Sequence, residues 1–115
     1  MSDFAVSIER LLNQVRHWEE RRWSQPAGSA PAAGGAARAG GGAVTRAQAV
    51  FALAQTLADL GAEAEKGPVR EVPFVHAMVL PDQLRVLADD IVAAGPPPEL
   101  LTRATAAVTD TRSAL

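Results

Sequence analysis

The sequence contains no cysteine and no tyrosine, and its only aromatic residues are two tryptophans and three phenylalanines. The absence of cysteine excludes disulfide bonds, zinc–thiolate sites, iron–sulfur clusters and thiol nucleophiles. Lysine is also scarce, because Lys66 is the only one and the other basic residues are arginines. The net charge of −2 argues against a nucleic-acid partner that is recognised through bulk positive charge.

Large apolar side chains are few. Hydrophobic residues make up 48% of the 115 residues, but alanine contributes much of that share. Alanine favours helix and buries little area per residue. A chain of this length fits one domain with a limited core, so association with a second copy or another protein is a natural way to bury more surface.

The N-terminal stretch reads MSDFAVSIERLLNQVRHWEE and carries charges throughout. It lacks the continuous apolar stretch of a signal peptide or a membrane span. We therefore expect a cytoplasmic protein with no membrane span.

An amphipathic helix is predicted over residues 1–23. Its apolar residues recur at spacings of four, three, four and three, which places them on one face of a helix. They are Phe4, Ile8, Leu11, Val15 and Trp18.

A flexible linker is predicted over residues 24–44, which read SQPAGSAPAAGGAARAGGGAV. This composition buries too little surface to offset the entropy lost on ordering. The linker would let the first helix dock on its own chain or on a neighbouring copy.

Three further helices are predicted from apolar residues that recur at helical spacing. They cover residues 45–64, 81–94 and 98–115, with an extended connector over residues 68–80. The sequence thus predicts an all-α fold, a small four-helix bundle in which the first helix is joined by the Gly/Ala/Pro linker to a three-helix body over residues 45–115.

Local signals mark the ends of these helices. Thr45 and Gln48 have the spacing of a capping box, and Pro81 and Pro98 suit first helical turns. Gly61 is expected to weaken or end the second helix.

The N-terminal helix is the leading candidate for an interaction surface. Tryptophan and arginine dominate the energetics of many protein interfaces, and both are concentrated near the end of this helix. The candidate residues are Phe4, Ile8, Leu11, Val15, Trp18, Arg21, Arg22 and Trp23. Core packing is the competing interpretation of the apolar members, and especially of Trp18.

A candidate ligand pocket lies in the connector, between Val72, Phe74, His76, Met78 and the flanking helices. A metal site is not predicted, because His17 and Glu20 occur once, in the reverse order to the Glu-x-x-His motif of di-iron bundles. No nucleophile elbow, zincin motif or nucleotide-binding fingerprint is present. We therefore predict no catalytic residues, no cofactor and no metal.

Two short stretches carry a resemblance. The residues Val15-Arg16-His17-Trp18, and Leu80-Pro81-Asp82-Gln83-Leu84 at the start of a later helix, are similar to small helical proteins of high-GC bacteria. The matched stretches cover only the first helix and the last third of the chain. The resemblance implies a bacterial origin, but no activity and no site residues.

The sequence favours a non-enzymatic helical protein-interaction or adaptor protein, with a protein partner or self-association through the N-terminal helix. A small-molecule-binding bundle, or a minor enzyme with its pocket near His76, is the first alternative. A nucleic-acid-associated regulator is the second.

Overall fold

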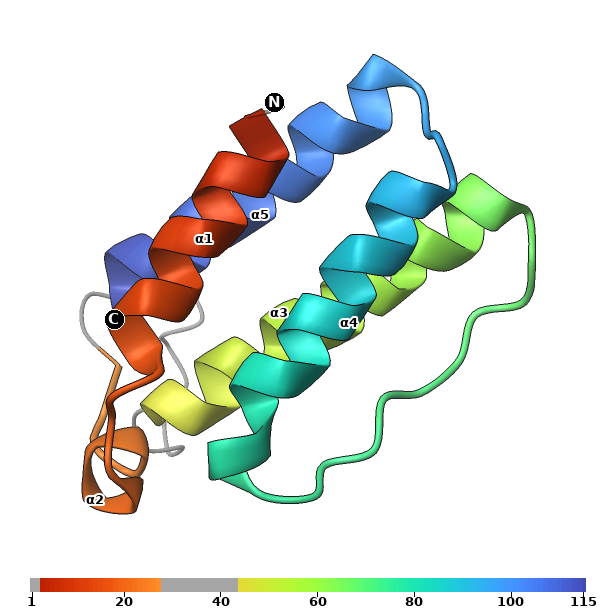
Figure 1. Ribbon diagram of the computed structural model, residues 1–115. Helices are drawn as coiled ribbons and strands as arrows, with labels where there is room; N and C mark the ends of the chain where they lie inside the picture. The colour runs from red at the N-terminus through yellow and green to blue at the C-terminus, as the bar shows by residue number, and fades with distance from the viewer. Residues whose placement is uncertain (1–2, 28–43) are drawn as a thin grey trace.

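The computed structural model describes residues 3–27 and 44–115, and its helices are drawn in Figure 1. They are α1 (Asp3–Val15), α2 (Glu20–Trp23), α3 (Arg46–Glu65), α4 (Leu80–Ala93) and α5 (Pro98–Ala114), with a 3-10 turn, η2 (Ala77–Val79), before α4. These residues contain no β-strand, so the prediction of an all-α fold is confirmed for them. The three later helices start and end within one residue of their predicted bounds.

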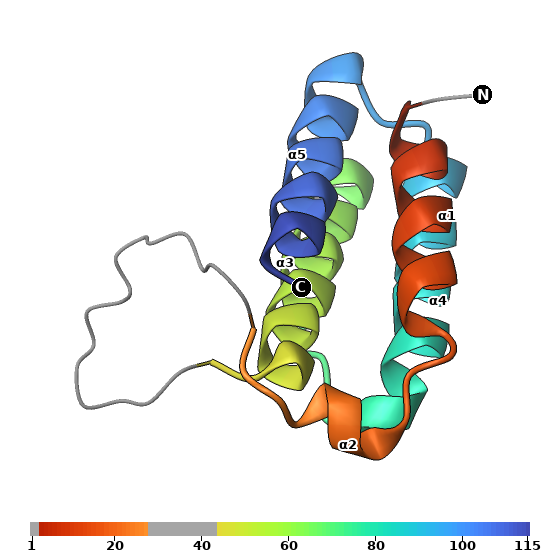
Figure 2. The same ribbon diagram turned by 90° about the vertical axis from the view of Figure 1, so that its left-hand side faces the viewer.

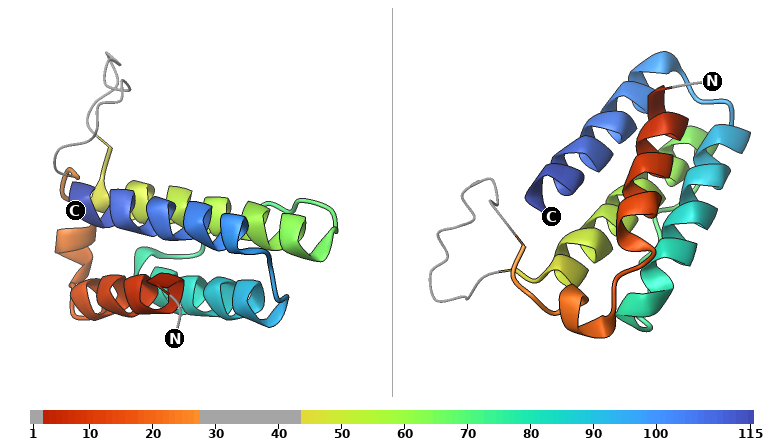
Figure 3. Two further views of the ribbon diagram at one scale, coloured as in Figure 1. Left: turned by 90° about the horizontal axis from the view of Figure 1, so that it is seen from above. Right: turned by 60° about the vertical axis from the view of Figure 1, so that its left-hand side comes forward.

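The four longer helices surround a common core. α1 contacts α4 and α5, and α3 contacts the same two helices from the other side. Viewed from above, α3 and α5 form one layer, and α1 and α4 form the other (Figure 3). The short helix α2 crosses one end of the bundle, where it contacts α3 and η2 (Figure 2).

The core consists entirely of apolar side chains, and within the described residues no polar or charged residue is buried. All four longer helices contribute to one continuous cluster, including Phe4 from α1, Leu57 from α3, Leu84 from α4 and Leu100 from α5. The apolar side chains of α1 supply a large part of this cluster. The N-terminal helix therefore belongs to the same core as the three later helices.

The first helix is shorter than predicted. The sequence predicts one helix over residues 1–23, but α1 ends at Val15 and the chain turns through Arg16 and His17 before α2 begins. The amide of Trp18 donates to the carbonyl of Val15 (3.0 Å), which closes this turn. The single N-terminal helix is thus two helices, and the described residues form five α-helices instead of four.

The two tryptophans give the physical reason for the break. Residues five apart on a continuous helix point about 140° away from each other, so Trp18 and Trp23 could not both face the core. With the turn between α1 and α2, Trp18 is 7% exposed and Trp23 is 1% exposed. Their rings then meet edge to face, with centroids 5.0 Å apart, which is a favourable aromatic geometry.

The ends of the predicted linker lie side by side. The Ala27 amide donates to the Val44 carbonyl (2.7 Å), and the Arg46 amide donates to the Gln25 carbonyl (2.9 Å). An isolated bridge also joins Pro26 to Thr45. Residues 28–43 of the predicted linker lie outside the described residues. The described ends are fixed to each other, so α1 docks on its own chain.

Both ends of α3 are capped. The predicted capping box is present: Thr45 Oγ1 accepts from the Gln48 amide (3.0 Å), and Gln48 Oε1 accepts from the Thr45 amide (2.9 Å). At the other end Lys66 adopts the left-handed conformation (φ 57°), and the Gly67 amide donates to the Ala62 carbonyl (2.9 Å). This closing pattern usually has glycine at the left-handed position.

Surface ion pairs connect helices across the bundle. Arg85 on α4 donates to Glu9 on α1 (2.8 Å), and Arg103 on α5 binds Glu63 on α3. Hydrogen bonds from Arg103 lower the pKa of the Glu63 carboxyl and raise the pKa of the arginine. Because these groups are exposed, solvent screens the pairs and they add little to stability. Whatever stabilisation the lowered pKa of Glu63 gives is present near neutral pH and is lost as pH falls through that pKa.

Gly61 does not end α3, which continues through it to Glu65 as the predicted range of 45–64 implied. A Cβ added at Gly61 would lie 3.6 Å from Ile91 Cγ1, an ordinary contact distance. Gly61→Ala should therefore raise the free energy of unfolding by about 0.5–1 kcal/mol, through better helix propensity. Urea unfolding followed by circular dichroism measures this change.

Gly95 provides the matched control. It follows α4 with φ +63°, and a Cβ there would meet no atom within 4 Å. Gly95→Ala should lower stability by about 1 kcal/mol, because alanine is strained at positive φ. Equal effects of the two substitutions would contradict the role assigned to Gly61.

Candidate functional site

The apolar members of the predicted N-terminal interaction surface form part of the core. Their exposed fractions are at most 7%: Phe4, Ile8, Leu11, Val15, Trp18 and Trp23. They pack within one chain, against α4, α5 and the start of α3. The apolar stripe thus packs against the helical body, as one of the two interpretations expected, and in this structure its side chains are not accessible to a partner.

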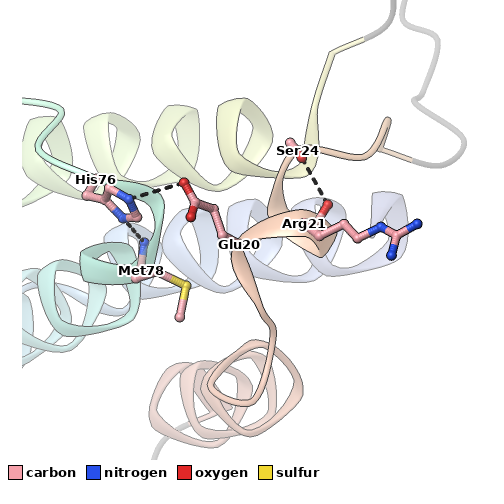
Figure 4. Close-up of polar contacts among 5 residues, drawn as sticks. All are labelled: Glu20, Arg21, Ser24, His76 and Met78. Atoms are coloured by element: carbon pink, nitrogen blue, oxygen red, sulfur yellow. Dashed lines mark hydrogen bonds and ion pairs between the residues drawn. The ribbon is translucent and has the colours of Figure 1, made fainter.

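The two arginines of that predicted surface are exposed. The guanidinium of Arg22 lies over the Trp18 ring, with Cζ 5.4 Å from the ring centroid, and Arg46 lies 5.5 Å from the same centroid. The Arg21 side chain extends away from α2, and the Arg21 backbone carbonyl accepts a hydrogen bond from the Ser24 hydroxyl (2.9 Å; Figure 4). Arg22 thus covers the edge of the core, while Arg21 faces solvent.

Leu11 tests the core assignment, since it is fully buried on α1. Leu11→Ala should lower the free energy of unfolding by about 2–5 kcal/mol, because it removes buried apolar volume. Urea titration gives the value. Asn13→Ala, at an exposed position on the same helix, should change stability by less than about 0.5 kcal/mol. A Leu11→Ala variant of unchanged stability but altered oligomeric state would contradict the core assignment.

Of the residues predicted to form a ligand pocket, Phe74, His76 and Met78 are exposed and do not line the groove described below, whereas Val72 does. Phe74 is 55% exposed and Met78 is 47% exposed, and His76 is exposed as well. The Phe74 ring packs edge to face on Phe51 of α3, with centroids 5.4 Å apart. The three residues therefore lie on the outside of the connector and the following turn.

His76 has a structural role (Figure 4). Its Nδ1 accepts a hydrogen bond from the Met78 amide (3.1 Å), which caps η2. Its Nε2 lies 3.4 Å from Glu20 Oε2 on α2. A neutral imidazole that accepts at Nδ1 carries its proton at Nε2, so it can donate to the Glu20 carboxylate. His76 thereby links α2 to the start of α4.

Replacing His76 should have a modest effect on stability. His76→Ala removes one cap and one exposed side-chain contact with Glu20, so the free energy of unfolding should fall by about 1 kcal/mol or less. Chemical unfolding checks this, with His17→Ala, at an exposed position in the turn after α1, as the control. A loss well above 2 kcal/mol would show that His76 supports packing that its exposure does not reveal.

An open groove of about 560 Å³ lies on the other side of the connector, between the connector, α3 and α4. Its α3 wall includes Leu57, Ala58, Gly61 and Ala62. Its α4 wall includes Asp82, Gln83, Val86, Leu87 and Asp90. The connector wall includes Pro68, Arg70, Glu71, Val72 and Pro73. In Figure 1 the connector arches away from α3 and α4 before it turns into η2.

Two glutamines attach the connector to the helices. Gln55 on α3 accepts from the Val72 amide (2.8 Å) and donates to the Arg70 carbonyl (3.0 Å). Gln83 on α4 donates to the Pro73 carbonyl (3.0 Å). The arch is thus fixed at its middle by side-chain hydrogen bonds. Gln83 Oε1 is buried and has no hydrogen-bond partner in the described residues.

Acidic groups predominate around the groove. Four carboxylates line it, from Glu65, Glu71, Asp82 and Asp90, against the single guanidinium of Arg70. No ion pair within the described residues involves any of these five side chains. The groove therefore combines an apolar floor with a negatively charged rim.

Of the two residues weighed for a metal site, Glu20 lies against His76, and His17 lies in the turn after α1. In the described parts of the chain, no group of three or more histidine, aspartate or glutamate side chains is arranged to hold a metal ion. In the same residues, no helix is both long and apolar enough to cross a membrane.

Sequence reasoning missed the α4 wall of the groove. Asp82 and Asp90 are exposed, and they line this wall. The available signal was the spacing of Asp82, Val86 and Asp90, which are four residues apart and so lie on one side of the helix. The sequence did not show that the connector would arch over this side of α4.

No protein-family model matches the chain, and no curated protein or solved structure is similar to it. The resemblance to small helical proteins of high-GC bacteria stays a prediction. The function has to be inferred from the surface of the molecule.

Proposed function

We propose that this chain is a non-enzymatic helical protein that binds a partner protein through its connector and the adjoining side of α4. One observation carries the proposal. Of the seven exposed large apolar side chains in the described residues, six lie between residues 69 and 92: Val69, Phe74, Val75, Met78, Val86 and Val92. Elsewhere in the described residues, large apolar side chains are at least partly buried, with Val44 as the exception.

The concentration of these side chains supports binding over chance exposure. Single exposed apolar residues are common on protein surfaces, but a group of them beside a groove is typical of an interaction site. Phe74 and Val75 lie in an extended stretch fixed to α3 and α4 through the glutamine side chains, so they are presented on a stable support. The proposal moves the interaction surface from the N-terminal helix to the connector.

A small-molecule-binding protein is the second candidate, and the groove favours it. A volume of about 560 Å³ falls within the usual range for ligand pockets. The unpartnered Gln83 Oε1 would accept a hydrogen bond from such a ligand. The openness of the arch and the apolar side chains outside it favour a protein segment as the occupant.

Other parts of the proposal come from the sequence. The chain would act in the bacterial cytoplasm, where thiols are kept reduced and proteins are not stabilised by disulfide bonds. A nucleic-acid-associated role is disfavoured by the net charge of −2 and by the acidic groups near the apolar side chains. Self-association is one form of the proposed interaction, now through the connector.

Site-specific photocrosslinking in cells tests the proposal. A photoreactive amino acid at position 75, which is 64% exposed, should give a discrete crosslinked product with a partner or with a second copy. The additional substitution Phe74→Asp should reduce that product by about ten-fold or more, because a charge replaces an apolar contact at the interface. Gel shift and mass spectrometry identify the product.

The same photoreactive residue at position 109 is the matched control, since Thr109 is exposed on α5. It should not give the product seen at position 75. Equal products at both positions, or a product that is insensitive to Phe74→Asp, would overturn the proposal.

A further inference from the structure

We infer that the groove between the connector, α3 and α4 binds a short, basic, apolar segment of the partner protein. This inference depends on the proposed function, because it assigns the chemistry of the partner segment. It depends on three observations: the apolar floor of the groove, its unpaired acidic rim and the spacing of residues on the α4 wall.

The floor offers apolar surface without large side chains that would fill it. Three small residues, Ala58, Gly61 and Ala62, form most of the α3 wall. Leu57 from α3 and Leu87 from α4 add apolar surface to the lining. Val86 projects from α4 and is 58% exposed. Burial of this surface favours an occupant with aliphatic side chains, since the driving force grows with the apolar area removed from water.

The rim gives the charge of the occupant. Four carboxylates and one guanidinium leave the lining with a net charge of −3. No ion pair within the described residues neutralises these groups. Lysine or arginine side chains on the bound segment would complement this charge, whereas an acidic segment would be repelled.

The spacing on α4 gives the length of the segment. Asp82, Val86 and Asp90 are successive residues at intervals of four, about 6 Å apart along the helix axis. The two carboxylates are therefore about 12 Å apart, with the valine between them. An extended peptide covers that distance in about four residues, so basic residues at both ends and aliphatic residues between them would match the wall.

Other occupants fit these observations less well. An anionic membrane surface and a nucleic acid would both be repelled by the acidic rim. A second copy of this chain has a net charge of −2, so as a whole it complements the acidic rim poorly. The charge complementarity thus favours a basic segment of a different protein.

Titration of the full chain with two capped five-residue peptides tests the inference. One peptide has Lys at each end and Leu-Val-Leu between, and the other has Glu at each end. Amide resonances of Gly61, Gly67 and Val86 should shift saturably with the lysine peptide in 15N NMR spectra. The glutamate peptide should bind about ten-fold more weakly or not at all, because its charge has the wrong sign.

Charge variants identify the site. Asp82→Asn combined with Asp90→Asn should weaken binding of the lysine peptide by about three- to ten-fold, because two attractive charges are removed. Asp89→Asn is the matched control, since Asp89 is exposed beside Asp90 but does not line the groove. It should leave the affinity unchanged. Circular dichroism shows whether each variant is folded.

Three results would overturn the inference: no saturable shifts at the groove amides, equal affinity for the two peptides, or equal weakening by Asp89→Asn. These results can be distinguished from a failure of the proposed function, which the crosslinking experiment tests. If crosslinking at position 75 succeeds while the lysine peptide fails, the protein binds a partner through the outside of the connector and the groove assignment is wrong. If both fail, the proposed function is wrong as well.

Discussion

Trp18 and Trp23 pack edge to face where α1 stops, and neither ring could be buried with the other unless the chain turned between them. That turn directs α2 across the end of the bundle. There it contacts the start of α3 and the turn before α4, and Glu20 reaches His76. Arg22 and Arg46 lie against the Trp18 ring and help to shield it from solvent. The packing of the two tryptophans thus determines where α2, the start of α3 and the turn before α4 meet.

The shortage of large apolar residues gives α1 a large share in the core. Only five side chains in the chain are aromatic, and the apolar face of α1 packs in one cluster with residues of α4 and α5, including Leu84 and Leu100. A helix committed in this way has no apolar face left for a partner. Most of the exposed apolar side chains lie instead on the connector. Hydrogen bonds from Gln55 and Gln83 fix the connector, and an open groove lies between it, α3 and α4.

Much of the helical content was predictable because its signals are local. The capping box at Thr45, the prolines that open α4 and α5, and the apolar periodicity of each helix act through neighbours in the sequence. The break after Val15 was not predictable in this way. The apolar spacing continues smoothly through Trp18, and the reason for the turn is a contact between Trp18 and Trp23 that exists only after folding.

The candidate site shows the same division. The residues between Val69 and Val75 are visible in the sequence as an apolar, proline-interrupted stretch, and their extended conformation was predictable. Whether such a stretch packs down or arches outward depends on two glutamines, one on α3 and one on α4, that are distant in sequence from each other. The acidic rim likewise joins Glu65, Glu71 and Asp82 from three different segments.

By itself, the sequence determined which segments are helical and where most of them end, because propensity, capping and periodicity act over a few residues. It also determined that cysteine chemistry is excluded and that the apolar supply is small. Only the tertiary structure decided that α1 is buried in its own chain, that the connector holds open an acidic groove, and that most of the exposed apolar side chains lie on the connector and α4. Those outcomes depend on contacts between distant residues, which compete for the same limited core.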